Sequence, residues 1–259
     1  MNPLTRWRLD GQRALISGAS TGIGAAIAEQ LLELGAEVCL VARDEDALAD
    51  FADELREAYP QGRVFELAAD LANGEQRAEV FDWLNDLGGD LHLLINNVGG
   101  NTPMPALDIR PADWQTLFEL NVFSALDLCR RAHPLLSQHP SSAIVNIGSV
   151  SGAIHVRTGV LYGMSKAAIH QMTRNLACEW ADDGIRVNAL LPWYIRTRRT
   201  SELLADPDYY EEVIGRTPLG RIGEPEEVAS AAVFLCLPAA SYISGQLLAV
   251  DGGFQSFGF

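Results

Sequence analysis

The amino-acid sequence predicts an α/β protein with a doubly wound, mostly parallel sheet of about seven strands and helices on both faces. Three observations support this fold class. Short apolar segments alternate with longer helical ones along the whole chain, as in parallel sheets covered by helices. The apolar fraction is 48% over 259 residues, which is enough for one large core. A glycine-rich turn joins the first predicted strand to the first predicted helix.

The individual elements follow from local composition. The run 91–95 is short and fully apolar, which is typical of a strand buried on both faces. Pro111 and Pro225 stand at first-turn positions of two helices, and Gly35 and Gly184 end two others. We expect strands at 13–17, 37–42, 63–68, 91–95, 143–148, 185–191 and 246–250, and helices at 23–34, 44–59, 75–87, 111–136, 159–182 and 224–237.

Composition and charge restrict the function. We expect a single domain over residues 1–259, because the chain shows no repeat, low-complexity segment or linker. The net charge of −15 argues against nucleic acid or an anionic membrane as a partner, since both repel an acidic surface. No apolar run is long enough to span a membrane and no signal pattern opens the chain, so we expect a cytoplasmic protein. The four cysteines are widely spaced in apolar segments, which predicts buried reduced thiols and no metal site.

The glycine-rich turn, GASTGIG from Gly18 to Gly24, predicts a phosphate site. A helix N-terminus offers free N–H groups and the positive end of the helix dipole, both of which attract phosphate. Glycine permits the tight turn and lets a pyrophosphate approach the backbone. We expect the turn to bind a dinucleotide through Gly18, Ser20, Thr21, Gly22, Ile23 and Gly24.

A second pattern spans Ser149 to Lys166. Tyr162 and Lys166 are four residues apart in a predicted helix, so they share one face. An ammonium near a phenol stabilises the phenolate, and Ser149, at the end of an apolar strand, can hydrogen-bond the same substrate oxygen. Together these groups predict a proton donor and acceptor site without a metal or a nucleophile. A lone Tyr-x-x-x-Lys pair is also common on helix surfaces, and the phosphate site is what favours the catalytic interpretation.

Motifs distributed along the chain carry a family resemblance. In order they are Gly18-x3-Gly22-x-Gly24, Asn96-Asn97-Val98-Gly99, Asn121, Ser149, Tyr162-x3-Lys166 and Asp251-Gly252-Gly253. This combination resembles the single-domain short-chain dehydrogenase/reductases, which have a Rossmann-type fold. Within that family the stretches at 174–181, 192–197, 216–228 and 234–253 are similar to tropinone reductase and its relatives.

The resemblance assigns roles to four residues. It implies that Tyr162 is the general acid in carbonyl reduction and the base in alcohol oxidation, and that Ser149 holds the substrate oxygen. Lys166 is expected to lower the pKa of the tyrosine and to bind the nicotinamide ribose. Asn121 is expected to support a water that relays protons to Lys166.

The resemblance also implies further cofactor contacts. Asn97 and Gly99 adjoin the cofactor, and Asn97 additionally ties neighbouring strands together. Asp70, next to Leu71, is expected to hydrogen-bond the adenine, and a solvated turn carboxylate is the alternative interpretation. The loop after the sixth strand covers the nicotinamide, with contacts from Pro192, Ile195 and Thr197.

The end of the second strand bears on the choice between NADP(H) and NAD(H). An acidic group at this point accepts the ribose hydroxyls of NAD, but here Ala42 stands there and Arg43 follows. The arginine fork suits a 2′-phosphate, so NADP(H) is favoured over NAD(H). Asp44 remains an alternative ribose acceptor if the strand ends one residue later, and Thr21 stands where many NADP-using relatives have a basic residue.

The substrate is expected to be a small, mostly apolar ketone or secondary alcohol. The stretches 100–106, 152–161 and 193–218 should surround it, with pocket residues Met104, Ile154, His155, Leu161, Trp193 and Tyr194. Trp193 stands where many family members have glycine. The first stretch lacks the charged or aromatic side chain that tropinone reductases often carry, which disfavours tropinone itself.

Other functions stay open at this point. A reductase of 3-oxoacyl groups on carrier protein shares the catalytic set, but it needs a basic docking surface and this chain is acidic. An NAD-linked alcohol or sugar dehydrogenase and a non-catalytic nucleotide-sensing module are further alternatives. The apolar C-terminal stretch, together with the pairing of the last helix and strand across a twofold axis in the resembled family, predicts a homodimer or homotetramer.

Overall fold

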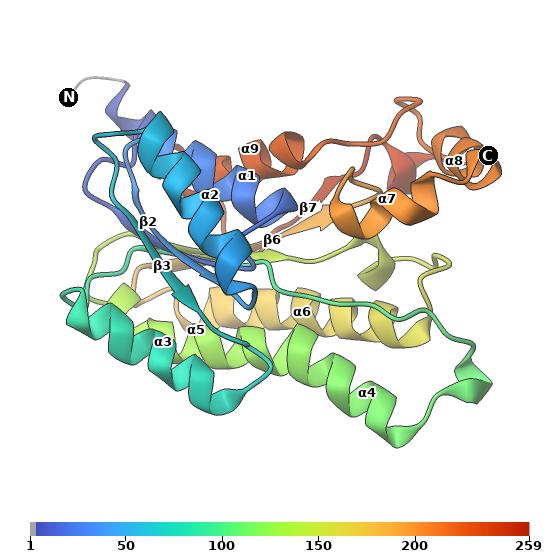
Figure 1. The fold of residues 1–259 in the computed structure, drawn as a ribbon, viewed down its shortest axis with the longest axis horizontal. Helices are drawn as coiled ribbons and strands as arrows, with labels where there is room; N and C mark the ends of the chain where they lie inside the picture. Colours follow the sequence, from blue (N-terminus) through green and yellow to red (C-terminus); the bar gives the residue numbers. More distant parts are fainter. Residues whose placement is uncertain (1–3, 259) are drawn as a thin grey trace.

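The computed structural model describes residues 4–258 and contains one seven-stranded parallel sheet in the order β3-β2-β1-β4-β5-β6-β7 (Figure 1). The strands are β1 (Arg13–Ser17), β2 (Glu37–Ala42), β3 (Val64–Ala68), β4 (Leu93–Asn96), β5 (Ser142–Ile147), β6 (Ile185–Pro192) and β7 (Leu247–Val250). The strand order reverses direction at β1, so β1 and β4 are neighbours although two strands separate them in the sequence. Ligands of such sheets bind beyond the carboxyl ends of the strands at this switch point.

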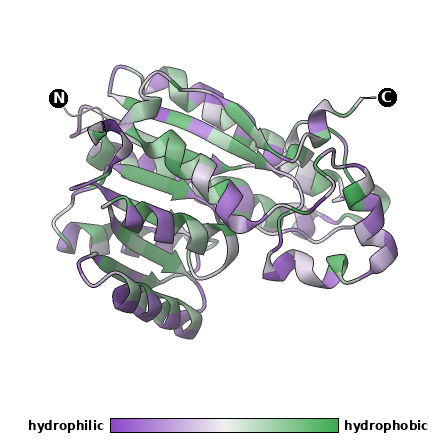
Figure 2. Ribbon diagram, turned by 90° about the horizontal axis from the view of Figure 1, so that it is seen from above, coloured by the Kyte–Doolittle hydropathy of each residue, from purple (hydrophilic) through white to green (hydrophobic). Residues whose placement is uncertain are grey.

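Helices cover both faces of the sheet (Figure 1). One layer comprises α1 (Gly22–Glu33), α2 (Glu45–Ala58) and α9 (Pro225–Cys236), and the other comprises α3 (Gly74–Asp86), α5 (Ser124–Leu136) and α6 (Val160–Glu179). Each layer encloses its own apolar core against the sheet. Figure 2 shows the hydrophobic strands between helices that alternate hydrophilic and hydrophobic residues. The predicted fold class is therefore confirmed.

The predicted continuous helix at 111–136 is interrupted. The structure has α4 (Pro111–Phe118), a π-helical segment (Glu119–Phe123) and then α5. The π segment adds a residue to the turn that carries Asn121, and the hydroxyl of Ser124 donates to the carbonyl of Leu120 within it. Insertions of this kind often lie at functional sites.

Two short helices follow β6 before the chain returns to the sheet. They are α7 (Arg198–Leu204) and α8 (Pro207–Gly215), drawn in orange beyond the carboxyl ends of the strands in Figure 1. The side chain of Asp206 caps α8 by accepting hydrogen bonds from two backbone N–H groups. These helices form a lid over the region where β1, β4, β5 and β6 end. None of the helices within residues 4–258 is long and apolar enough to cross a membrane.

Candidate active site

A cavity of about 610 Å³ lies beyond the carboxyl ends of the central strands. Most of the predicted cofactor and catalytic residues line it, although they come from seven separate segments of the chain. They are Gly18, Ser20, Thr21, Gly22, Ile23, Arg43, Asp70, Leu71, Asn97, Gly99, Ser149, Tyr162, Lys166, Pro192, Ile195 and Thr197. The fold thus brings together groups as far apart in sequence as Gly18 and Thr197.

The turn after β1 is built closely enough to require glycine. Gly22 has a φ of +61°, a conformation that L side chains rarely adopt. A Cβ on Gly24 would lie 2.2 Å from the carbonyl oxygen of Gly18. The amide of Asn97 donates to that same carbonyl at 2.9 Å and to the carbonyl of Ser17 at 3.1 Å, which ties β4 to β1. The first turn of α1 therefore opens directly onto the cavity, an arrangement that fits a pyrophosphate.

The far end of the cavity contains Arg43, Asp44 and Asp70. Strand β2 ends at Ala42, and the carboxylate of Asp44 caps α2 by accepting from the N–H of Ala47 at 3.2 Å. The carboxylate of Asp70 accepts from the N–H of Ala72 at 3.0 Å. Arg43 is exposed and lines the cavity, so its guanidinium is accessible to a ligand there.

Ser149, Tyr162 and Lys166 meet at the other end. Ser149 follows β5 and hydrogen-bonds the phenol of Tyr162 from α6. The ammonium of Lys166, one turn further along α6, donates to the carbonyl of Ile147 at 2.8 Å and lies 5.7 Å from the centre of the Tyr162 ring. A substrate oxygen placed between the two hydroxyls can accept hydrogen bonds from both.

Burial has the largest effect on the pKa values of Tyr162 and Lys166. It raises the pKa of Tyr162 above 10, although the hydrogen bond from Ser149 and the positive charge of Arg199 oppose the shift. Burial, together with the charge of Arg199, lowers the pKa of Lys166 to about 7. The sequence leads us to expect that Lys166 lowers the pKa of Tyr162, whereas in the structure burial raises it. The phenol is protonated at neutral pH, which is the form required to donate a proton to the oxygen of a carbonyl substrate as that carbonyl is reduced.

Asn121 lies behind the cavity lining in the π segment and is fully buried. Its side-chain oxygen accepts from the N–H of Gly100 at 2.7 Å, and its amide donates to the Gly100 carbonyl at 2.9 Å and to the hydroxyl of Ser165 at 3.0 Å. The Asn121 oxygen and the Lys166 ammonium both lie against Gly99. Asn121 in the π segment and Lys166 on α6, the two residues expected to take part in the proton relay, are therefore neighbours in space.

The predicted substrate residues separate into two places. Met104, Ile154 and His155 line a second cavity of about 820 Å³, whereas Trp193 lines the first. Ser151 and Gly163, close neighbours of Ser149 and Tyr162 in sequence, also line the second cavity.

The two remaining predicted substrate residues line neither of these cavities, within the part of the chain that is described. Leu161 is buried on α6, and Tyr194 hydrogen-bonds the hydroxyl of Tyr209 on α8. His155, although it lines the second cavity, is an exposed loop residue.

Arg198 and Arg199 are cavity residues that the sequence analysis did not single out. Both lie in the first turn of α7, and the guanidinium of Arg199 donates to the carbonyl of Gly99 across the cavity. The only signal in the sequence is the cluster RTRR at 196–199, whose placement depends on how the lid folds back.

Comparisons with known proteins agree with this geometry. A family model described as enoyl-(acyl carrier protein) reductase matches residues 18–255. A chloroplastic tropinone reductase homologue of Arabidopsis thaliana is 44% identical over 98% of this chain and 79% of its own length. Among solved structures, a gluconate 5-dehydrogenase from Burkholderia cenocepacia in complex with NADP and tartrate has a TM-score of 0.92 at 31% identity, covering 98% of this chain and 99% of its own. A 7α-hydroxysteroid dehydrogenase in complex with NADH and a 7-oxo bile acid has a TM-score of 0.92 at 34% identity, covering 98% of both chains.

The fold, the motifs and these similarities define a class: the chain belongs to the short-chain dehydrogenase/reductase family, with relatives among the tropinone reductase homologues. It is accordingly an NAD(P)-dependent oxidoreductase that acts on alcohol or ketone groups of small molecules.

Proposed function

We propose that this enzyme is an NADP(H)-dependent reductase of a small, mostly apolar ketone, which also oxidises the corresponding secondary alcohol. The observation that carries the proposal is that one cavity is lined both by the glycine turn at the start of α1 and by the hydroxyls of Ser149 and Tyr162. A dinucleotide held at the first group places its reactive end towards the second.

Different residues of this chain bind the cofactor, hold the substrate oxygen and transfer the proton. Gly22 lines the cavity where the pyrophosphate would lie, and Gly24 lets the first turn of α1 pack against the Gly18 carbonyl. Thr21, whose side chain does not cap α1, is free to hydrogen-bond the pyrophosphate. Bound NADPH supplies the hydride for the carbonyl carbon. Ser149 and Tyr162 hold the carbonyl oxygen, and Tyr162 donates the proton as negative charge develops there. Lys166 returns a proton to Tyr162 from the interior side, and Asn121 supports the water that passes protons to Lys166.

The substrate class rests on the second cavity. Its walls are largely apolar, with Met104, Ile154, Val160 and Met164 among the lining residues. Ser151, whose N–H donates to the hydroxyl of Ser149 at 3.1 Å, lines this cavity, as does Gly163, the residue after Tyr162. We therefore take this cavity as the place into which a ketone bound between Ser149 and Tyr162 extends. A screen of carbonyl compounds that follows NADPH absorbance, with small cyclic ketones included, tests this class. Preference for charged or sugar-like ketones would contradict it.

Replacing Tyr162 with phenylalanine tests the catalytic assignment. Loss of the donor hydroxyl should lower kcat about 10²- to 10⁴-fold, because proton transfer from a positioned group contributes that much. NADPH affinity, measured by fluorescence titration, should change little. Tyr242→Phe is a matched control on a fully exposed tyrosine, and it should leave turnover unchanged. Undiminished turnover in Tyr162→Phe would remove the tyrosine from the mechanism.

The preference for NADP(H) rests on Arg43, because the carboxylate of Asp44 is engaged in capping α2. Arg43→Ala should weaken NADPH binding about tenfold, the effect of losing one charge-assisted hydrogen bond, and leave NADH binding unchanged. Arg63→Ala is the control for net charge. Arg63 is an exposed arginine just before the start of β3, whereas Arg43 follows the end of the neighbouring strand β2. Equal wild-type affinity for NADPH and NADH would instead favour the NAD-linked alternative, in which Asp44 accepts the ribose.

A further inference from the structure

Arg77 on α3 lies outside the cavity, yet its guanidinium connects two parts of the site. Its side chain is only 9% exposed. Nη1 donates to the carbonyl of Leu71 at 2.8 Å, Nε donates to the carboxylate of Asp127 at 2.8 Å, and Nη2 donates to the carboxylate of Glu119 at 2.9 Å. Each of its three nitrogens is therefore bonded to a different segment or residue.

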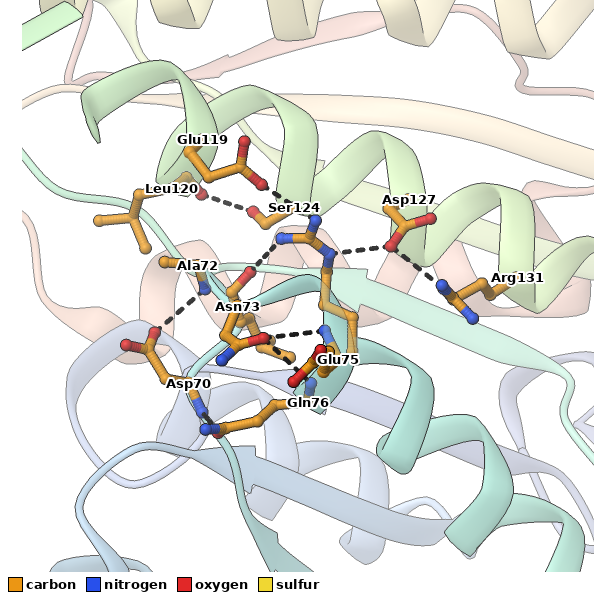
Figure 3. Close-up of polar contacts among 12 residues, drawn as sticks. Asp70, Ala72, Asn73, Glu75, Gln76, Glu119, Leu120, Ser124, Asp127 and Arg131 are labelled. Atoms are coloured by element: carbon orange, nitrogen blue, oxygen red, sulfur yellow. Dashed lines mark hydrogen bonds and ion pairs between the residues drawn. The ribbon is translucent and has the colours of Figure 1, made fainter. Parts of the chain in front are cut away.

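The two carboxylates bracket the π segment. Glu119 is the first residue of the π segment and Asp127 lies one turn into α5; both are labelled in Figure 3. Because Arg77 pairs with both carboxylates, it holds the chain before and after Asn121. The pKa of Asp127 is lowered: burial acts to raise it, but the hydrogen bonds from Arg77 and Arg131 outweigh that effect. The contact between Arg77 and Asp127 is consequently ionic at neutral pH.

The third bond reaches the loop after β3. Asp70 and Leu71 in this loop line the cavity at the end that should hold the adenine. The loop is also tied to α3, because Gln76 accepts from the N–H of Asp70 and Asn73 caps the helix (Figure 3). The Leu71 carbonyl is thus the point at which the loop is joined, through Arg77, to the π segment.

We propose that Arg77 is a positioning residue that couples the adenine-side loop to Asn121, so that cofactor binding and the proton relay depend on the same side chain. The inference rests on the proposed function. Guanidinium is suited to this position because its planar fork presents donors in three directions, whereas an ammonium is a point charge on a flexible stem. A purely structural role, which only attaches α3 to α5, is the alternative.

Two variants separate these roles. Arg77→Lys keeps the charge but cannot reach Leu71, Glu119 and Asp127 together. It should lower NADPH affinity about tenfold, measured by fluorescence titration without substrate, and lower kcat by a similar factor. Glu119→Ala removes only the acceptor that Arg77 uses on the π segment, so kcat should fall while NADPH affinity stays unchanged. Arg131→Lys is the control: Arg131 also bonds Asp127 but touches neither Leu71 nor Glu119, and both quantities should stay at the wild-type value.

A double-mutant cycle with Asn121→Ala tests the coupling itself. If Arg77 acts through Asn121, the loss of kcat in the double variant is smaller than the product of the two single losses. Circular dichroism and thermal unfolding establish that each variant is folded at the assay temperature. Multiplicative losses, or an Arg77→Lys variant that differs from wild type only in thermal stability, would overturn the proposal. The proposed function would fail through a different result, undiminished turnover in Tyr162→Phe. The two failures can therefore be distinguished.

Discussion

At the scale of single residues, the ammonium of Lys166 lies in an environment that disfavours its positive charge. It is buried, lies within range of the positive charge of Arg199, and has one protein acceptor in the carbonyl of Ile147. An ordinary lysine would avoid such a place, because removing an ammonium from water is costly. Strain of this kind is typical of functional sites, where stability is lost in exchange for chemistry.

Lys166→Met should reveal that cost as a pH dependence. The pKa is about 7 in the folded enzyme against 10.5 for the ordinary side chain, so between these values the unfolded chain holds a proton that the folded chain lacks. The penalty is complete below pH 7 and vanishes as the pH rises to 10.5. The stability gained on replacing Lys166 with Met, measured by urea unfolding of the cofactor-free protein, should therefore be largest at or below pH 7 and shrink towards pH 10. Parallel stability curves for the two proteins would show that Lys166 titrates normally.

At the scale of elements, the junction of β1 and α1 depends on close backbone contact. Gly24→Ala should destabilise the fold by about 1–3 kcal/mol and weaken cofactor binding, because the new methyl meets the Gly18 carbonyl and the Asn97 amide. Gly215→Ala is the matched control, since nothing lies within 4 Å of its Cβ position in α8. That change should be neutral or slightly stabilising. Urea unfolding and NADPH titration measure both effects, and equal behaviour of the two variants would contradict the steric argument.

How far the sequence predicts each element depends on whether the signal is local. Gly18 to Gly24 and the Tyr162–Lys166 pair are predicted because chain neighbours determine the turn and the shared helix face. The sequence does not predict the break in the helix at Glu119. One inserted π residue leaves the apolar pattern of 111–136 nearly intact, and Arg77, which pairs with Glu119, is far away in sequence. Arg199 is missed for a similar reason: it reaches Gly99 only after the lid folds back over the sheet.

At the scale of the whole molecule, the sheet has two edge strands, β3 and β7. Within residues 4–258, β7 pairs only with β6, and Leu248 on this edge strand is 40% exposed. Unpaired edge strands invite association with another chain. The site itself is formed within one chain from both halves of the sequence, so association is not needed to complete the cavity described above.

We expect a homodimer or homotetramer in which this edge is an interface. Leu248→Glu should shift the mass measured by light scattering towards the monomer, because a carboxylate is costly to bury at an apolar contact. Leu203→Glu, on an exposed leucine of α7, is the control for added charge. An unchanged mass for Leu248→Glu would place the interface elsewhere or show that the protein is monomeric.

The chain has 18 arginines but a single lysine, and that lysine is Lys166. An amine with a pKa of about 7 is largely uncharged, and hence nucleophilic, under mildly alkaline conditions, while the arginine guanidiniums stay charged and resist acylation. Amine-directed reagents small enough to enter the cavity should therefore label the enzyme at one side chain only, with bound dinucleotide giving protection. The catalytic centre could in this way carry a fluorophore or a surface tether without any engineered attachment point.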